Sequence, residues 1–353
     1  MAEPKPIMIV KDAKRAAREW VMEEASEAPG FCGALYAGST NWLPDEAAFP
    51  PTSDVDVWVV LADRGQPAKL GKFIRRDVIL DVSCLPSDQL LSPDRILGDY
   101  HLAGSFRTPS IIADPSGRLT KLQAAVSRDF AKRRWVYRRC EHAKNRVLRN
   151  LRSLNASEPF HDKVTAWLFA TGVTTHVLLV AGLRNPTVRQ RYVAVRELLA
   201  DYGRMDFYET LLKMLGCARM SRESVSQHLT ALTEVFDAAK AVVKTPFPFA
   251  SDISDVARPI TIDGSWDLIS RGYHREAIFW MVATYSRCQK VLYHDAPAEM
   301  RDRFGPGYLQ LLGDLGISSF ADLRQRNEQV ELFLPRVWEV AEAIMAANPG
   351  IGD

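Results

Sequence analysis

The 353-residue sequence has few of the features that mark secreted, zinc-binding or repeat proteins. Its five cysteines are scattered and form no C-x-x-C pair, which argues against a disulfide framework or a zinc site and is typical of a reducing cytoplasm. The seven histidines show no H-E-x-x-H spacing. The N-terminal segment is charged throughout and has no apolar signal core. We therefore expect a cytoplasmic protein.

Long apolar runs are also scarce, with one exception. Between Lys163 and Arg184 lie 20 uncharged residues, a length that can cross a bilayer. Four threonines, two glycines and His176 dilute the hydrophobicity of this stretch. The central helix of an α-helical domain has the same composition, so we expect a soluble protein that does not enter a membrane.

The predicted secondary structure changes near residue 119. Before it, a helical spacing over 10–26 is followed by short apolar or β-branched runs that predict strands at 31–37, 55–61, 76–85 and 110–114. A polar connection containing Gly65, Pro67 and Gly71 precedes the strand at 76–85. After it, helical patterns dominate near 117–153, 161–183, 187–202, 205–216, 221–242, 267–294 and 318–346, and Gly305-Pro306-Gly307 predicts a loop between the last two. We predict an α+β protein with two domains: residues 1–118 form a mixed sheet flanked by helices, and residues 119–353 form an all-helical domain.

Two carboxylates stand out in the strand predicted at 55–61. Asp54 and Asp56 are two residues apart, so both side chains leave the same face of the strand, while Val55 and Val57 occupy the other. Adjacent carboxylates repel each other and are costly to desolvate. A divalent cation resolves this conflict, because Mg²⁺ prefers carboxylate oxygens together with substrate phosphates.

Asp81 is the third candidate ligand. It interrupts the apolar run of the strand predicted at 76–85, where a core strand should stay apolar. If this strand pairs beside the one carrying Asp54 and Asp56, all three carboxylates face one site. Three carboxylates that hold two cations about 3.5–4 Å apart can align an attacking oxygen with a leaving phosphate.

Gly38, Ser39 and Thr40 follow the first predicted strand and supply a turn that suits phosphate binding. A glycine lets the backbone approach a phosphate closely. A helix that begins at the serine or threonine would direct free N–H groups at an anion. The order of strand, Gly-Ser turn, D-x-D strand and Asp-containing strand therefore places phosphate donors and metal ligands at one end of a sheet.

The motifs AGST, SDVDVWVV and ILDVSCL, which lie within about residues 30–90, resemble those of the DNA polymerase β-like nucleotidyltransferase superfamily. In overall plan the chain is similar to the antibiotic nucleotidyltransferases of that superfamily, in which a helical domain follows a minimal catalytic domain. The resemblance implies that Gly38, Ser39 and Thr40 bind the triphosphate of ATP or another NTP. It also implies that Asp54, Asp56 and Asp81 hold two Mg²⁺ ions.

Two departures from the family pattern affect this expectation. The segment between the Gly-Ser pair and the D-x-D motif, residues 40–53, is 14 residues long, slightly longer than usual, and contains three prolines together with Trp42 and Phe49. It could shape a substrate pocket or block one. The basic residue that often follows the Gly-Ser turn in the family is absent.

The helical half contains candidates for the remaining chemistry. Residues 119–153 carry eleven Lys or Arg and two acidic residues, a local charge of +9 that could face the triphosphate, bind nucleic acid or lie on a solvated helix face. Glu141, the only acid in the densest part of this run, is the candidate general base, by the analogy that antibiotic-modifying relatives use a glutamate from their second domain. Glu197 and Glu276 compete for that role, and His274 is a candidate proton carrier.

The sequence therefore predicts an enzyme that transfers NMP from an NTP to a hydroxyl of a small molecule, such as an aminoglycoside-like antibiotic, and releases pyrophosphate. A second hypothesis keeps this chemistry but gives it an RNA or protein acceptor. A third is a noncatalytic nucleotide-binding protein that retains the fold. The residues specify neither the acceptor nor the base preference.

Overall fold

The computed structural model describes residues 7–62 and 69–353, which divide into two compact units. The first unit extends to Phe130 and contains a sheet, whereas Ala131–Asp353 is helical apart from its turns and loops. The α+β class predicted from the sequence is confirmed. The division lies 12 residues beyond the boundary predicted at 118/119, because helix α4 (Arg118–Asp129) belongs to the sheet unit.

In the described part of the first unit, five strands form a mixed sheet with the order β3-β4-β2-β1-β5. Their bounds are β1 (Phe31–Ala37), β2 (Val55–Leu61), β3 (Lys69–Arg75), β4 (Val78–Pro86) and β5 (Ile111–Ala113). Strands β2 and β4 are parallel, and the other neighbouring pairs are antiparallel. Four of these strands correspond to the predicted ones, and β3 is the one that the sequence analysis missed.

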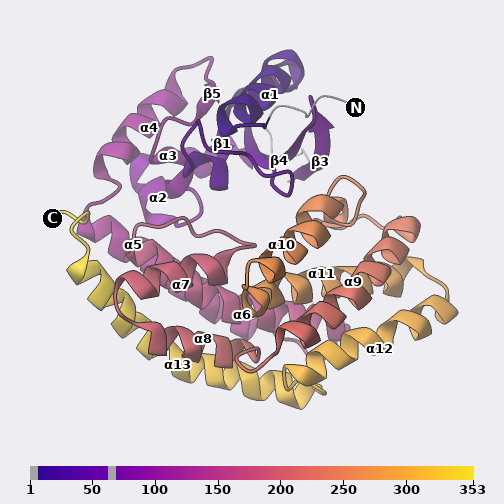
Figure 1. Ribbon diagram of the computed structural model, residues 1–353. Helices are drawn as coiled ribbons and strands as arrows, with labels where there is room; N and C mark the ends of the chain where they lie inside the picture. Colours follow the sequence, from indigo (N-terminus) through magenta and orange to yellow (C-terminus); the bar gives the residue numbers. More distant parts are fainter. Residues whose placement is uncertain (1–6, 63–68) are drawn as a thin grey trace. The chain divides into compact units, whose positions relative to one another are not determined.

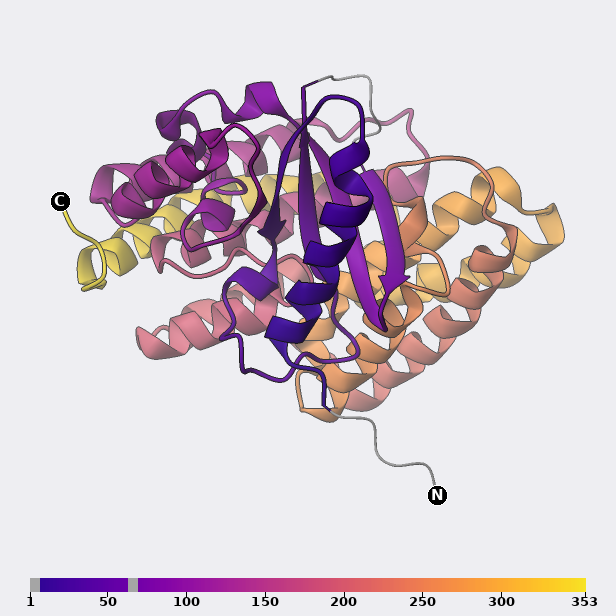
Figure 2. The same ribbon diagram turned by 90° about the horizontal axis from the view of Figure 1, so that it is seen from above.

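Helix α1 (Val10–Glu23) covers one face of this sheet (Figure 2). Its apolar positions recur at helical spacing, so residues such as Ala13, Ala17 and Trp20 are buried on one side. They share a core with the valines at alternate positions of β2, including Val55 and Val57. The period of two along a strand then directs the intervening residues of β2 to the opposite face.

Strands β3 and β4 form a hairpin whose turn explains an error in the prediction. The strand expected at 76–85 begins only at Val78, because Arg76 and Asp77 have φ angles of 49° and 62° and make the two-residue turn. The segment before this turn was interpreted as a polar connection containing Gly65, Pro67 and Gly71. Gly65 and Pro67 lie outside the described residues, whereas Gly71 lies within β3.

Short helices complete the first unit. They are α2 (Pro93–Gly98), α3 (Ala103–Phe106) and α4, which pack against one another, and α3 also contacts β1. The predicted helix over 117–153 is two helices, α4 and α5 (Arg133–Arg152). The chain is extended at Lys132, which pairs with Gly352 as an isolated parallel bridge, so backbone pairing interrupts the helical pattern.

The second unit is built from helices (Figure 1). They are α5, α6 (Phe160–Ala181), α7 (Arg191–Asp201), α8 (Met205–Leu215), α9 (Arg222–Val242), α10 (Gly264–Ser270), α11 (His274–Asp295), α12 (Ala298–Asp314) and α13 (Phe320–Ala347). The helix predicted over 267–294 is interrupted at Gly272, which has a φ of 87°. Helix α12 was missed because Gly305, Pro306 and Gly307 suggested a loop, but burial of Tyr308 and Leu311 outweighs their poor helix propensity.

Helix α6 contains the uncharged stretch of the sequence. Its length and composition would suit a membrane span, but 83% of its most apolar window is buried inside the structure. It packs against α5, α11 and α13, and Figure 1 shows it among those helices. Both features are those of the central helix of a soluble helical domain, as the sequence analysis expected.

Candidate metal centre

The sheet brings the three predicted carboxylates together. The parallel register of β2 and β4 places Asp56 directly beside Asp81, and Asp54 immediately precedes β2. One oxygen from each of the three side chains lies within 4.8 Å of the other two. The alternation of the strands directs these carboxylates to the sheet face opposite α1, since Val55 and Leu80 pair on the α1 side. The geometric part of the prediction is therefore fulfilled: both strands present their carboxylates at one place.

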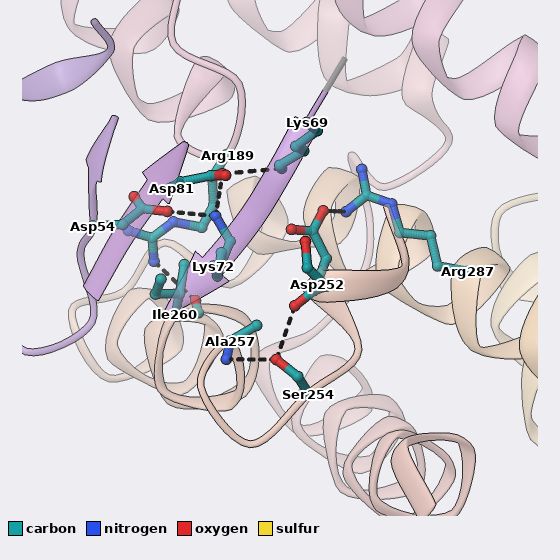
Figure 3. A network of polar contacts seen from close by, with 11 residues as sticks. Asp54, Lys69, Lys72, Asp81, Arg189, Asp252, Ser254, Ala257, Ile260 and Arg287 are labelled. Atoms are coloured by element: carbon teal, nitrogen blue, oxygen red, sulfur yellow. Dashed lines mark hydrogen bonds and ion pairs between the residues drawn. The ribbon is translucent and has the colours of Figure 1, made fainter. Parts of the chain in front are cut away.

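Two lysines that were not predicted as site residues form hydrogen bonds with Asp54 and Asp81 (Figure 3). Lys72 Nζ donates to Asp54 Oδ2 at 2.6 Å and also to Asp81 Oδ2. Lys69 Nζ donates to Asp81 Oδ2 at 3.0 Å. A register irregularity in β3 between Lys69 and Gly71 brings both lysines to the carboxylate face although they are three positions apart.

The pKa values of the neighbouring Asp56 and Asp81 are shifted in opposite directions. Burial and the adjacent carboxylates of Asp54 and Asp81 raise the pKa of Asp56 well above its ordinary value. Burial also acts to raise the pKa of Asp81, but the ammonium groups of Lys72 and Lys69 outweigh it and the net pKa is lowered. Negative charge is therefore stabilised at Asp81 and opposed at Asp56.

The turn after β1 places backbone against this cluster. Gly38 has φ 61° and ψ −153°, a conformation that side chains disfavour. A Cβ at this position would lie 1.8 Å from Asp56 Oδ2, so only glycine lets the turn approach the carboxylate. Ser39 begins a three-residue 3-10 turn, Ser39–Asn41, and not the longer helix considered from the sequence. Thr40 is fully buried and its hydroxyl donates to Ala37 O, which is a structural contact within the turn.

The 14-residue segment between the Gly-Ser pair and the D-x-D motif is fixed by packing. Phe49 is buried in the core shared by α1 and the sheet. Trp42 lies under the guanidinium of Arg107, whose carbon is 4.5 Å from the ring centroid, and next to Gly104. These two aromatic residues therefore stabilise the sheet unit itself.

The donor set suits a hard divalent cation. Its oxygens are close enough to share ions, and such cations take carboxylate ligands. Within the described residues, Asp81 Oδ1 is buried and has no hydrogen-bond partner. Burial, together with the negative charge of Asp54 and Asp81, raises the pKa of Asp56, and a bound cation would stabilise the ionised carboxylate. Asp54, Asp56 and Asp81 are the residues that could hold the metal.

The candidate bases lie in the helical unit. Glu141 is half-buried on α5, where its neighbours are engaged differently: Arg138 lies over the Trp135 ring, and burial lowers the pKa of Arg139 to about 10. Of its competitors, Glu276 is buried and accepts a hydrogen bond from Tyr208, whereas the side chain of Glu197 is exposed.

His274, the candidate proton carrier, has its ring Nε2 3.2 Å from Met220 O. The buried contact of Glu276 with Tyr208 gives that glutamate a structural role. Glu141 therefore stays the prediction for the general base.

Comparison with known proteins adds no relative: no protein-family model matches the chain, and no curated protein matches its sequence.

Proposed function

We propose that this chain is a cytoplasmic, divalent-cation-dependent nucleotidyltransferase that moves NMP from an NTP to a hydroxyl of a small molecule. The observation that carries the proposal is the register of β2 and β4, which sets Asp56 beside Asp81 and next to Asp54 on one sheet face. Such a concentration of carboxylates is costly unless a cation and its phosphate ligands use it. The Gly38 turn, which packs directly on Asp56, supports the same assignment.

The proposed reaction is an in-line displacement at the α-phosphorus. The acceptor oxygen forms a bond to that phosphorus, the bond from phosphorus to the β-bridging oxygen breaks, and pyrophosphate leaves with the electron pair of that bond. Mg²⁺ bound at the site would supply charge neutralisation for the phosphates during this exchange. Asp54 and Asp56 hold that charge in place, and Gly38 and Ser39 offer a turn short enough for backbone to approach the triphosphate.

The acceptor proton requires a base. Asp81 is poorly suited, because its pKa is lowered and a weakly basic carboxylate takes a proton reluctantly. Glu141 is the proposed alternative. An aminoglycoside-like hydroxyl compound is the leading acceptor, by analogy with the antibiotic nucleotidyltransferases that the motifs resemble.

One observation favours a second candidate, the same transfer to RNA. On the basic helix α5, Tyr137 is 39% exposed and meets Trp338 of α13 edge to face, with ring centroids 5.1 Å apart. Lys144 Nζ lies 4.3 Å from the Trp338 centroid. Partly exposed aromatic side chains beside cations are the elements with which proteins stack and neutralise single-stranded nucleic acid.

Pyrophosphate release measured with each NTP and Mg²⁺ tests the proposal. The acceptor panel should contain aminoglycosides, lincosamides, RNA and protein extract. Acceptor-dependent release that disappears in the Asp54→Asn/Asp56→Asn double variant is the expected result, and the acceptor that supports it identifies the substrate class. Asp94→Asn, an exposed carboxylate of the same unit, is the matched control and should keep full activity.

Two other outcomes contradict the proposal in different ways. NTP binding that requires Mg²⁺ but gives no release with any acceptor favours the noncatalytic nucleotide-binding hypothesis. Release that persists in the double variant places the chemistry elsewhere in the chain.

A further inference from the structure

The carboxylate cluster contains fixed positive charge from the protein itself. The ammonium of Lys72, on β3, bridges Asp81 of β4 and Asp54, which immediately precedes β2 (Figure 3). In the two-ion arrangement, one ion uses Asp54 and Asp56, and the other must reach Asp81 within about 3.5–4 Å of the first. The second ion would therefore need the same space that the Lys72 ammonium fills.

The position of Lys72 is determined by the strand that carries it. Residue 72 pairs with Asp81 in the antiparallel β3–β4 ladder, so the two side chains are cross-strand neighbours. The Lys72 side chain is 8% exposed, which limits how far the ammonium can swing towards water. Withdrawing it from both carboxylates would leave buried charges uncompensated, and this is costly.

The three carboxylates differ in the hydrogen bonds that they accept from the two lysines. Asp81 Oδ2 accepts hydrogen bonds from both lysines, whereas Asp56 accepts none from the described lysine side chains. The lysines therefore make two hydrogen bonds to Asp81 and one to Asp54, and among the described residues Asp56 is the carboxylate of the cluster that they leave without a hydrogen bond. The Asp56 side, against which Gly38 packs, is left for an external cation.

We propose that Lys72 takes the place of the second divalent cation, so that the site binds a single ion, at Asp54 and Asp56, together with the nucleotide. This inference rests on the proposed function. The Lys72 ammonium would strongly repel a second divalent ion that shared Asp81 with it. An ammonium neutralises charge and donates hydrogen bonds but does not coordinate an acceptor oxygen, so removal of the acceptor proton depends on a carboxylate base.

Counting bound Mn²⁺ by electron paramagnetic resonance tests the inference without any turnover. The full-length protein is titrated with Mn²⁺ alone and with the α,β-methylene analogue of each of the four NTPs. We expect one bound Mn²⁺ per chain for the wild type. Lys72→Met keeps the length of the side chain and removes its charge, so we expect two ions, the second bound at least about tenfold more tightly than in the wild type.

Lys69→Met is the matched control, because Lys69 lies on the same strand and also contacts Asp81 but does not bridge to Asp54. It should keep a count of one. Two ions in the wild type, or one in a folded Lys72→Met, overturn this inference and leave the nucleotidyltransferase proposal standing. No bound Mn²⁺ under any condition overturns the proposed function itself. Circular dichroism establishes whether Lys72→Met is folded, and if it is not, the wild-type count decides.

Discussion

The two units of this protein treat buried charge in opposite ways. In the helical unit, two of the buried charged groups have complementary partners: Arg287 pairs with Asp252 at 2.9 Å, and Glu276 accepts a hydrogen bond from Tyr208. In the sheet unit, three carboxylates converge on two ammonium groups, and burial with like charge opposes ionisation of Asp56. Packing alone favours the first arrangement. The second lowers stability, and such an excess of like charge is expected where a protein binds a ligand of opposite sign.

The largest effect should come from Asp56→Asn. The amide keeps the shape of the side chain but removes a cation ligand, so we expect NMP transfer to fall by about a thousandfold or more. Stability should change in the other direction. Because the pKa of Asp56 is raised, its ionised form is disfavoured in the folded state, and removing that charge should stabilise the metal-free protein by about 1 kcal/mol.

Steady-state kinetics and thermal unfolding in EDTA measure the two quantities on the same preparation. Asp94→Asn should change neither. A variant that loses activity and stability together would mean that Asp56 is a structural residue, and the contrast between the units would then disappear.

Gly38→Ala should give the next largest effect. The added Cβ meets Asp56 Oδ2 at 1.8 Å in a conformation that disfavours a side chain, so both the turn and the carboxylate must move. We expect a loss of about 1–3 kcal/mol of stability and roughly a hundredfold loss of activity. Mn²⁺ affinity and thermal unfolding report on the two consequences.

Gly117→Ala separates the clash from backbone strain. Gly117 also has a positive φ, 69°, but a Cβ there meets nothing within 4 Å. The Gly117→Ala variant should lose only the stability that corresponds to backbone strain, and its Mn²⁺ affinity should equal that of the wild type. Equal effects of the two substitutions on Mn²⁺ binding would show that the approach of Gly38 to Asp56 has no bearing on the site.

The three aspartates of the cluster could be predicted from the sequence, whereas its two lysines could not. Asp56 and Asp81 were recognisable because each interrupts an apolar strand, where a carboxylate is conspicuous, and Asp54 because it lies two residues before Asp56. Lys69 and Lys72 were not, because lysine is ordinary in a polar segment. Their shared face depends on an irregularity in the register of β3, which arises only when the hairpin forms.

The predicted helices have a clear local sequence pattern, whereas those that were missed depend on tertiary contacts. Helical periodicity located α1, α9 and α13, and the long uncharged stretch located α6. Helix α12 was hidden by Pro306 and its two flanking glycines, whose unfavourable propensities are offset by tertiary packing of Tyr308 and Leu311. The break between α4 and α5 depends on pairing of Lys132 with Gly352, a contact more than two hundred residues distant that no local pattern encodes.

Tyr208→Phe tests the helical side of the comparison. The substitution removes the hydroxyl that donates to buried Glu276, and a buried acceptor that loses its donor costs about 1–3 kcal/mol. We expect that loss in urea unfolding, with unchanged Mn²⁺ binding. Tyr293→Phe, at a tyrosine that is 52% exposed, should stay within about 0.5 kcal/mol of the wild type. A change in Mn²⁺ count on Tyr208→Phe would contradict the assignment of cation binding to the sheet unit.

The smallest effect should be a pH dependence that has opposite sign in the two units. Burial lowers the pKa of His161 in α6 to about 4, so the unfolded chain takes up the proton first as pH falls. Its contribution to stability is complete above about pH 6.5 and is lost towards pH 4, which amounts to about 1 kcal/mol between pH 7 and 5.5. Asp56 acts in reverse, because a raised carboxyl pKa makes the folded state gain stability as pH falls.

Unfolding free energies of the wild type, His161→Gln and Asp56→Asn between pH 7 and 5.5 separate these contributions. His161→Gln should make stability fall less on acidification, and Asp56→Asn should make it fall more, because the compensating gain is removed. His294→Gln, at an exposed histidine, should keep most of the wild-type dependence. If both test variants changed the pH dependence of the unfolding free energy in the same direction, the opposite contributions assigned to His161 and Asp56 would be wrong. Opposite changes would establish that the helical unit keeps the buried His161 neutral, whereas the sheet unit contains a buried carboxylate, Asp56, whose charge a bound cation would compensate.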